Sequence, residues 1–205
     1  MKLIAIDTSP KFLCLGLYDN GKIYEYRLEV GIKLSSLLVP TIKRVIESLQ
    51  WDFKNIDYFA CGLGPGSFTG VRVGLATIKG FAWSLRKPVV GVCTLDVMAK
   101  ALSVEQAIVV PLIDAKRSLL YASIYKVKGP RLSRVSKYML MPYDELISKV
   151  KADSALRQRP LIHCCGDALA IYSDALVKDL QGVKLLDKDY WYPQPRYLVV
   201  LALEL

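Results

Sequence analysis

Five glycines lie between residues 62 and 74, in the order Gly62-Leu-Gly-Pro-Gly-Ser-Phe-Thr-Gly-Val-Arg-Val-Gly74. A glycine-rich loop that leads into a helix can bind phosphate, because the first amide groups of the helix point at the anion. The Walker pattern requires Gly-Lys-Ser/Thr after the loop, whereas this chain has Gly66-Ser67-Phe68. The dinucleotide pattern Gly-x-Gly-x-x-Gly also fails, because its last position falls on Ser67 or Thr69. The run is therefore only a weak indication of phosphate chemistry.

Metal-dependent and hydrolytic chemistry have few candidate residues. The chain has one histidine, His163, which ends an apolar run and is predicted to be packed in the core. The five cysteines contain no Cys-x-x-Cys pair, which excludes a zinc ribbon by spacing. No serine lies in a Gly-x-Ser-x-Gly elbow, so a peptidase triad is not expected.

The glycine run is predicted to lie between a strand and a helix. Residues 56–61 are β-branched and aromatic, as in a buried strand. A helix is expected from about Gly70 to Arg86, capped by the hydroxyl of Ser67 or Thr69. One face of this helix has the spacing of a core stripe, made of Val71, Leu75, Ile78, Ala82 and Leu85. A second stripe contains Gly70, Gly74, Thr77 and Phe81, with Ala76, Gly80 and Trp83 nearby.

Glycine inside this helix requires an explanation. Each such glycine costs about 0.5–1 kcal/mol relative to alanine, so Gly74 and Gly80 indicate a close backbone approach. The second stripe packs either on the sheet of this chain or on a helix of another subunit. The sequence leaves both alternatives open.

The remaining segments predict alternating strands and helices. Three strands over 2–8, 13–18 and 22–30 form a meander with a hairpin turn at Asn20-Gly21. Further helices are expected over 34–49, 95–102, 143–150, 166–180 and 198–205, and further strands over 88–92, 108–114, 119–127, 132–138 and 160–164.

The composition is that of a basic globular chain. Of 205 residues, 53% are hydrophobic, and the net charge is +9, with +5 in the first hundred residues and +4 in the remainder. The excess favours association with tRNA or another acidic partner, or is simply a basic surface. No apolar run is long enough to span a membrane. The N-terminus enters a strand without a signal peptide, so we expect a cytoplasmic protein.

The segment Gly64-Pro-Gly-Ser-Phe-Thr-Gly-Val-Arg-Val-Gly74 resembles the signature of the bacterial TsaB (YeaZ) family. Members of that family take part in making threonylcarbamoyladenosine (t6A) at position 37 of tRNA. Four further segments are similar to family landmarks, namely Leu3–Ser9, Ser35–Pro40, Gly91–Leu95, and Ile113–Arg117 followed by Tyr121. The resemblance covers most of residues 1–125. Leu34 departs from it, since the family often has histidine at that place.

This resemblance implies the two-lobed α/β fold of the actin, Hsp70 and sugar-kinase superfamily, which is ribonuclease H-like, with a reduced second lobe. We expect an N-terminal lobe over 1–105, which carries the glycine motif, and a smaller C-terminal lobe over 106–205. In that fold Asp7 and Thr8 would face nucleotide phosphates and metal, and Asp114 could be a further carboxylate near the metal. The second lobe has only three isolated glycines, so any such nucleotide or metal site is expected to be vestigial.

The resemblance also implies a non-catalytic scaffold subunit of the t6A synthesis complex. It would bind the catalytic subunit TsaD, with the ATPase TsaE joining and tRNA reached through the complex. ATP and metal are expected on the partner subunits, and no cofactor in this chain. Without TsaD, the same surface would form a homodimer. The predicted partner interface, on the helices over 34–49 and 70–86, comprises Leu38, Ile42, Val45, Gly66, Phe68, Gly70, Val71, Val73, Gly74, Thr77 and Phe81.

Two other function classes remain open. One is a self-sufficient nucleotide-binding ATPase of the actin/Hsp70 superfamily, which Asp7 and the loop over 64–70 favour and the glycine-poor second lobe opposes. The other is a direct tRNA binder, whose affinity would depend strongly on salt.

Overall fold

A computed structural model describes residues 1–102, 106–152 and 161–205. The chain divides into two compact units. The first unit contains Met1–Val97 and Pro193–Leu205, and the second contains Met98–Tyr192. The expected division at residues 105 and 106 differs from this one in two ways: the first unit ends already at Val97, and the C-terminal segment returns to it.

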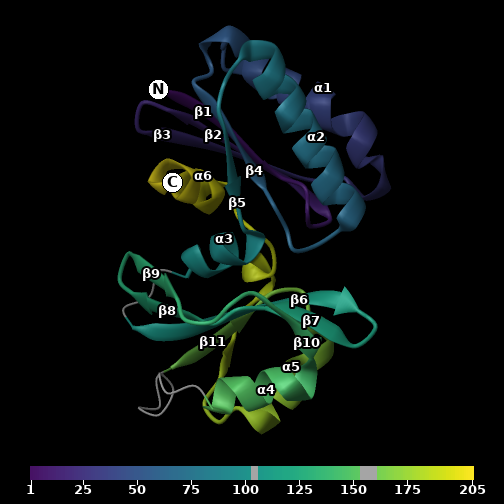
Figure 1. Ribbon diagram of the computed structural model, residues 1–205, viewed down its shortest axis with the longest axis vertical. Helices are drawn as coiled ribbons and strands as arrows, with labels where there is room; N and C mark the ends of the chain where they lie inside the picture. Colours follow the sequence, from purple (N-terminus) through teal and green to yellow (C-terminus); the bar gives the residue numbers. More distant parts are fainter. Residues whose placement is uncertain (103–105, 153–160) are drawn as a thin grey trace. The chain divides into compact units, whose positions relative to one another are not determined.

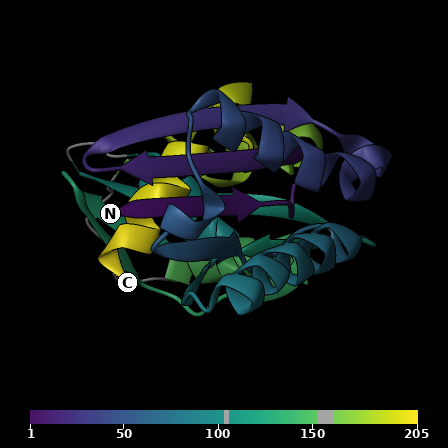
Figure 2. The same ribbon diagram turned by 90° about the horizontal axis from the view of Figure 1, so that it is seen from above.

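The first unit is built on a five-stranded sheet with the order β3-β2-β1-β4-β5. Strands β1 (Lys2–Asp7), β2 (Phe12–Asp19) and β3 (Lys22–Glu29) form the predicted antiparallel meander, which Figure 2 shows side by side. Asn20 and Gly21 both have positive φ in the turn from β2 to β3, as expected for a two-residue hairpin. Strands β4 (Tyr58–Gly62) and β5 (Val89–Val92) continue the sheet in parallel with β1.

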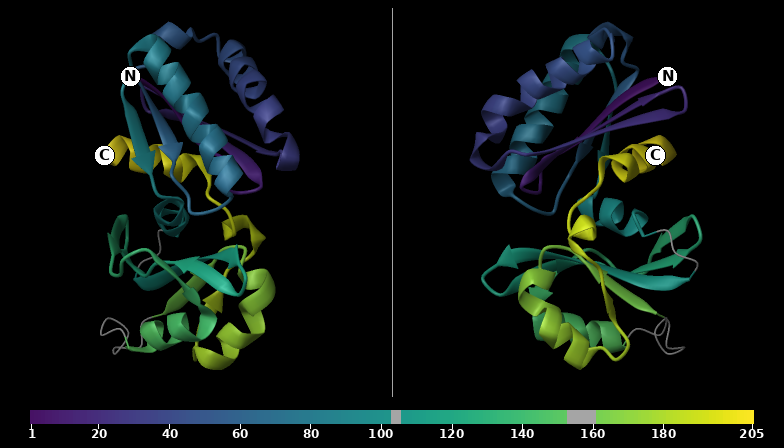
Figure 3. Two further views of the ribbon diagram at one scale, coloured as in Figure 1. Left: turned by 45° about the vertical axis from the view of Figure 1, so that its right-hand side comes forward. Right: turned by 180° about the vertical axis from the view of Figure 1, so that it is seen from behind.

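Helices cover both faces of this sheet because its central strands are apolar on both sides. Ile4 and Ile6 of β1 face one core, and the alternate residues Leu3 and Ala5 face the other. Helices α1 (Leu34–Ser48) and α2 (Phe68–Leu85) cover the first face, and α6 (Pro195–Glu204) covers the second (Figures 1 and 3).

Helix α6 approaches the sheet closely at Gly16. A Cβ atom at this position would lie 2.6 Å from Val199 Cγ2 and 2.7 Å from the Pro195 carbonyl oxygen. The Arg196 Nε atom also lies 2.9 Å from Glu25 Oε1 on β3. The helix expected over 198–205 is present and runs from Pro195 to Glu204, but its apolar side completes the core of the first unit rather than that of the second.

The second unit has a seven-stranded sheet in its described part. The main order is β10-β7-β6-β11-β12, and β8 pairs with β6 and with β9. The strands are β6 (Ala107–Lys116), β7 (Leu119–Ala122), β8 (Tyr125–Lys128), β9 (Arg131–Arg134), β10 (Met139–Pro142), β11 (Ile162–Cys165) and β12 (Lys184–Leu185).

Helices α4 (Tyr143–Ala152) and α5 (Leu169–Asp179) pack on this sheet through Leu146, Val150 and Leu176. Helix α3 (Thr94–Lys100) contains the boundary between the units. The single strand expected over 119–127 is two strands, because Ser123 and Ile124 interrupt the pairing. The strand expected over 160–164 begins at Ile162 in the described residues, since residue 160 lies outside them.

Both units thus combine mixed sheets with packed helices, which confirms the predicted α/β class. Among the described residues, no helix has the length and apolarity needed to cross a membrane.

Candidate functional site

The glycines of α2 hold the turn that follows β1. Thr8 is almost fully buried, and its Oγ1 atom donates a 2.7 Å hydrogen bond to the Gly70 carbonyl oxygen. A Cβ atom on Gly70 would overlap the Thr8 carbonyl oxygen, and one on Gly74 would overlap Thr8 Oγ1. Thr8 therefore occupies the space left by two absent side chains on the inner face of α2.

The loop before α2 surrounds the same turn. A Cβ atom on Gly62 would overlap the carboxyl group of Asp7, and one on Gly66 would lie 2.5 Å from the Ser9 carbonyl oxygen. The Ser67 amide donates to that same oxygen at 2.8 Å. Four glycines of the motif are thus explained by close packing on residues 7–9 of the same unit. Of the two alternatives for the glycine stripe, packing within the chain holds for Gly70 and Gly74.

Ser67, one of the two predicted capping residues, caps α2. Its Oγ atom accepts a 3.1 Å hydrogen bond from the Gly70 amide, which satisfies one of the free amide groups in the first helical turn. The helix spans 68–85, close to the expected 70–86. It ends at Arg86, which adopts the left-handed conformation with φ of 54°.

Asp7 is fully buried, and groups of the same unit donate hydrogen bonds to its carboxylate. Its Oδ1 atom accepts from the Ser9 amide at 2.8 Å, and its Oδ2 atom accepts from Thr94 Oγ1 at 2.7 Å. The Ser9 and Thr94 hydroxyls lie 3.0 Å apart and close the network. Burial raises the pKa of Asp7, and the hydrogen bonds from Ser9 and Thr94 oppose this shift. Asp7 therefore fixes the turn and the start of α3.

Asp114, the candidate in the second unit, holds a hairpin turn. Its Oδ1 atom accepts from the Lys116 amide at 2.8 Å, and its Oδ2 atom lies 2.7 Å from Lys116 Nζ. The hydrogen bond from the Lys116 side chain lowers the pKa of Asp114. The Asp114 amide donates to Asp167 Oδ1 at 3.0 Å. Lys116, Arg117 and Ser118 all have positive φ, which is unfavourable for residues other than glycine. The bonds made by Asp114 hold the turn in this conformation.

His163 is packed, as the sequence predicted. The side chain is 3% exposed, and neither ring nitrogen has a hydrogen-bond partner among the described residues. Burial and the nearby Lys184 lower the pKa of His163. Within residues 1–102, 106–152 and 161–205, no three His, Cys, Asp or Glu side chains are placed to share a metal ion.

The predicted partner residues fall into two groups. Leu38 and Ile42 are fully buried in the core of the first unit, and Gly70 and Gly74 are buried against Thr8. These four residues are therefore removed from the predicted surface. Phe68 is 74% exposed, and the half-buried candidates are Val45, Gly66, Val71, Val73, Thr77 and Phe81. As an interface, this second group remains a prediction.

The outer side of α2 carries residues that the predicted interface omitted. Arg72 places its guanidinium 5.0 Å from the centre of the Phe68 ring. Ala76 and Gly80, one turn apart, are both exposed, and a Cβ on Gly80 would meet no atom within 4 Å outside the neighbouring backbone of α2. Trp83 is 87% exposed. The available sequence signals were a glycine in mid-helix and a tryptophan outside the core stripe.

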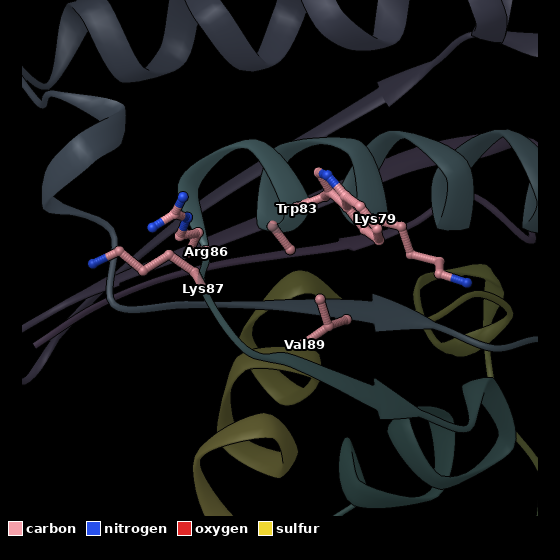
Figure 4. Close-up of a pocket in the computed structure, with 6 residues that line it drawn as sticks. Lys79, Trp83, Arg86, Lys87 and Val89 are labelled. Carbon is pink, nitrogen blue, oxygen red and sulfur yellow. The ribbon is translucent and has the colours of Figure 1, made fainter.

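Two hollows flank α2. One, of about 420 Å³, lies between α1 and α2 and is lined by Val39, Lys43, Ile46, Glu47, Trp51, Asp52, Phe53 and Phe81. The other, of about 540 Å³, lies between the end of α2 and β5 and is lined by Lys79, Ala82, Trp83, Arg86, Lys87 and Val89 (Figure 4).

The five-stranded sheet of the first unit and the helix-covered sheet of the second define the class as a mixed α/β protein built of two units. Comparison with solved structures agrees with this fold. YeaZ from Pseudomonas aeruginosa superposes with a TM-score of 0.81 at 24% identity, over 98% of this chain and 90% of that one.

Sequence comparison identifies the family. The family model described as TsaD, tRNA N6-adenosine threonylcarbamoyltransferase, matches residues 30–202. TsaB of Bacillus subtilis is 26% identical over 188 residues, which cover 90% of this chain and 78% of that protein. TsaB of Haemophilus influenzae is 28% identical over 98% of this chain and 85% of its own length. The chain belongs to the TsaB (YeaZ) family, whose members are named as tRNA threonylcarbamoyladenosine biosynthesis proteins.

Proposed function

We propose that the chain is a non-catalytic subunit of the t6A synthesis complex, which binds a TsaD-type catalytic subunit through the outer side of α1 and α2. Its family supports a role in t6A biosynthesis. The TsaD description of the matching family model supports a related chain as partner, because related folds can pair equivalent surfaces.

The state of Asp7 supports a scaffold rather than an ATPase. A carboxylate that binds a metal ion or positions a nucleophile needs a free oxygen facing the ligand. Both oxygens of Asp7 accept hydrogen bonds from the same unit, and the side chain is fully buried. Asp114 is likewise engaged by Lys116. ATP and metal are therefore assigned to the partner subunits in this proposal.

The open space at Gly80 is the single observation that most directly supports a partner-binding surface on α2. A glycine inside a helix costs about 0.5–1 kcal/mol relative to alanine. At Gly70 and Gly74 this cost has a reason within the unit, since Thr8 fills the space. At Gly80 an added Cβ would meet no atom within 4 Å outside the neighbouring backbone of α2, so no contact within this chain explains the missing side chain. A helix of another subunit that approaches α2 would supply the reason.

Other exposed residues of α1 and α2 also fit an approaching helix. Ala76 adds a second small residue one turn earlier, which lets two helix backbones come close. Phe68 exposes a large apolar side chain at the start of α2, and Val39 exposes one on α1. Burial of such side chains contributes about 25 cal/mol per Å² of apolar surface removed from water. The hollow between α1 and α2 gives a partner side chain a place to insert.

Co-purification with the catalytic subunit, followed by measurement of the mass of the complex, tests this proposal. Gly80→Leu should lose the complex, because the leucine side chain would separate the helices. Gly80→Ala serves as the conservative variant, and Ala170→Leu on the exposed side of α5 as the matched control. We expect complex with the control and with the wild type. Complex of unchanged yield with Gly80→Leu would place the partner elsewhere.

In the absence of the partner, the same surface is expected to pair two copies about a two-fold axis. Gly80→Leu should then shift the chain toward monomer in sedimentation experiments. A dimer that persists in Gly80→Leu would mean that self-association uses a different surface.

A further inference from the structure

The hollow between α2 and β5 is a concentrated basic site around one exposed aromatic side chain. Lys79, Arg86 and Lys87 line it together with Trp83, and no acidic residue is among the residues that line it (Figure 4). Arg86 and Lys87 lie at one end and Lys79 lies toward the other, with Val89 of β5 below them (Figure 4). Trp83 as a whole residue is 87% exposed.

The surrounding sequence strengthens this charge. Between Tyr58 and Leu95 the chain has four basic residues, Arg72 and the three of the hollow, and no Asp or Glu. Arg86 and Lys87 lie at the negative end of the α2 dipole, which partly explains their positive charge by helix stability alone. Lys79 in mid-helix and the exposed indole have no such reason within the unit. A strongly positive, aromatic site therefore remains on the surface.

We propose that this hollow, the Trp83 site, binds an unpaired segment of RNA, with a base stacked on Trp83 and phosphates contacted by Lys79, Arg86 and Lys87. Stacking of a base on an aromatic side chain and cations along the backbone are the two elements of single-strand recognition. Its volume of about 540 Å³ is within the range of small-ligand sites. The inference rests on the proposed function in one respect, because a role in t6A synthesis identifies tRNA as the RNA that this site would bind.

An acidic protein surface is the competing occupant. It would use the three cations and would also cover Trp83, since tryptophan and arginine are enriched at protein interfaces. The Trp83 site is also separate from the hollow between α1 and α2, because the two share no lining residue. Trp83 is, however, three residues after Gly80 on α2, so a partner helix at Gly80 would lie next to the Trp83 site, and each variant is measured both for RNA binding and for partner binding.

The test measures binding of a fluorescently labelled tRNA transcript to the full chain alone, by anisotropy at several salt concentrations. Trp83→Leu should weaken binding by about five- to a hundredfold, while Trp83→Phe, which keeps the stacking surface, should stay close to the wild type. Lys79→Gln should reduce the slope of log affinity against log salt by about one. Lys178→Gln on α5, which removes the same charge from an exposed helical position in the second unit, is the matched control.

A second arm compares a single-stranded oligoribonucleotide with a blunt RNA duplex of equal charge. We expect Trp83→Leu to weaken binding of the single strand and to leave binding of the duplex unchanged. Equal tRNA affinity of wild type and Trp83→Leu, or no measurable tRNA binding by the wild type, overturns the inference. A Trp83→Leu variant that loses only the catalytic subunit would identify the hollow as a protein contact. Measuring Gly80→Leu and Trp83→Leu in both the tRNA assay and the co-purification distinguishes failure of this inference from failure of the proposed function.

Discussion

Alanine at Gly70 and alanine at Gly80 should change stability in opposite directions, although both glycines belong to α2. At Gly70 the added methyl group would overlap the Thr8 carbonyl oxygen. That oxygen cannot move away easily, because β1 is paired with β2 and β4 up to the residues just before it. At Gly80 the added methyl group meets no atom within 4 Å outside the neighbouring backbone of α2.

The expected magnitudes follow from these contacts. Overpacking of a well-packed site typically costs about 1–3 kcal/mol, which applies to Gly70→Ala. Gly80→Ala gains only helix propensity, about 0.5–1 kcal/mol. With a urea m-value of about 2 kcal/mol/M, the midpoint should fall by about 0.5–1.5 M for Gly70→Ala and rise by about 0.25–0.5 M for Gly80→Ala.

Urea unfolding of the full chain, followed by far-ultraviolet circular dichroism, measures both shifts. Each variant is the control for the other, since the chemical change and the helix are the same. If Gly70→Ala unfolds at the same urea concentration as the wild type, the turn over 7–9 does not fill the glycine groove. If Gly80→Ala is destabilised, Gly80 has a role within the unit and the argument for a partner surface fails.

Two further predictions concern buried ionisable groups. The pKa of His163 is held below its ordinary value of 6.5 in the folded chain, so the unfolded chain takes up its proton first as the pH falls. Stability should decrease below about pH 6.5, and His163→Leu should flatten urea midpoints measured between pH 7.5 and 5.5; an unchanged slope would contradict the burial argument. The pKa of Asp7 is raised, so protonation of Asp7 should add stability as the pH falls through its folded-state pKa toward 3.8. Asp7→Asn should remove that gain in the same unfolding experiment and should leave tRNA modification by the reconstituted complex unchanged; loss of modification with an intact complex would assign Asp7 a chemical role.

Local rules predicted the elements whose signals lie within a few residues. The turn at Asn20-Gly21, the Ser67 cap and the helices α1, α2 and α5 follow from turn chemistry and from apolar periodicity. The packed state of His163 followed from its apolar neighbours.

The roles of the glycines could not be read in this way. In the sequence, Gly74 and Gly80 are both simply glycines inside one predicted helix. Only the position of Thr8 in the folded chain distinguishes their structural roles. Leu38 and Ile42 were predicted to contact a partner because the sequence of an apolar helix face does not reveal whether it packs on its own sheet or on another subunit. For the same reason, the apolar side of residues 198–205 did not reveal that α6 returns to the first unit, where Gly16 admits it.

The Trp83 site was also beyond sequence reasoning. Four basic residues without a carboxylate over residues 58–95 are visible in the sequence. That three of these cations line one hollow with Trp83 depends on where α2 ends and β5 begins. Sequence patterns identified the elements, and long-range packing determined which of their faces stay open.

Amide hydrogen exchange of the full chain, with and without the catalytic subunit, tests the central claim most directly. The amides of Ser9 and Ser67 donate to Asp7 and to the Ser9 carbonyl, so we predict slow exchange there already in the free chain. Addition of the catalytic subunit should then slow exchange mainly in the peptides that cover α1 and α2. Rapid exchange at residues 7–9 and 62–70 in the free chain, with protection that appears only on binding, would contradict the account.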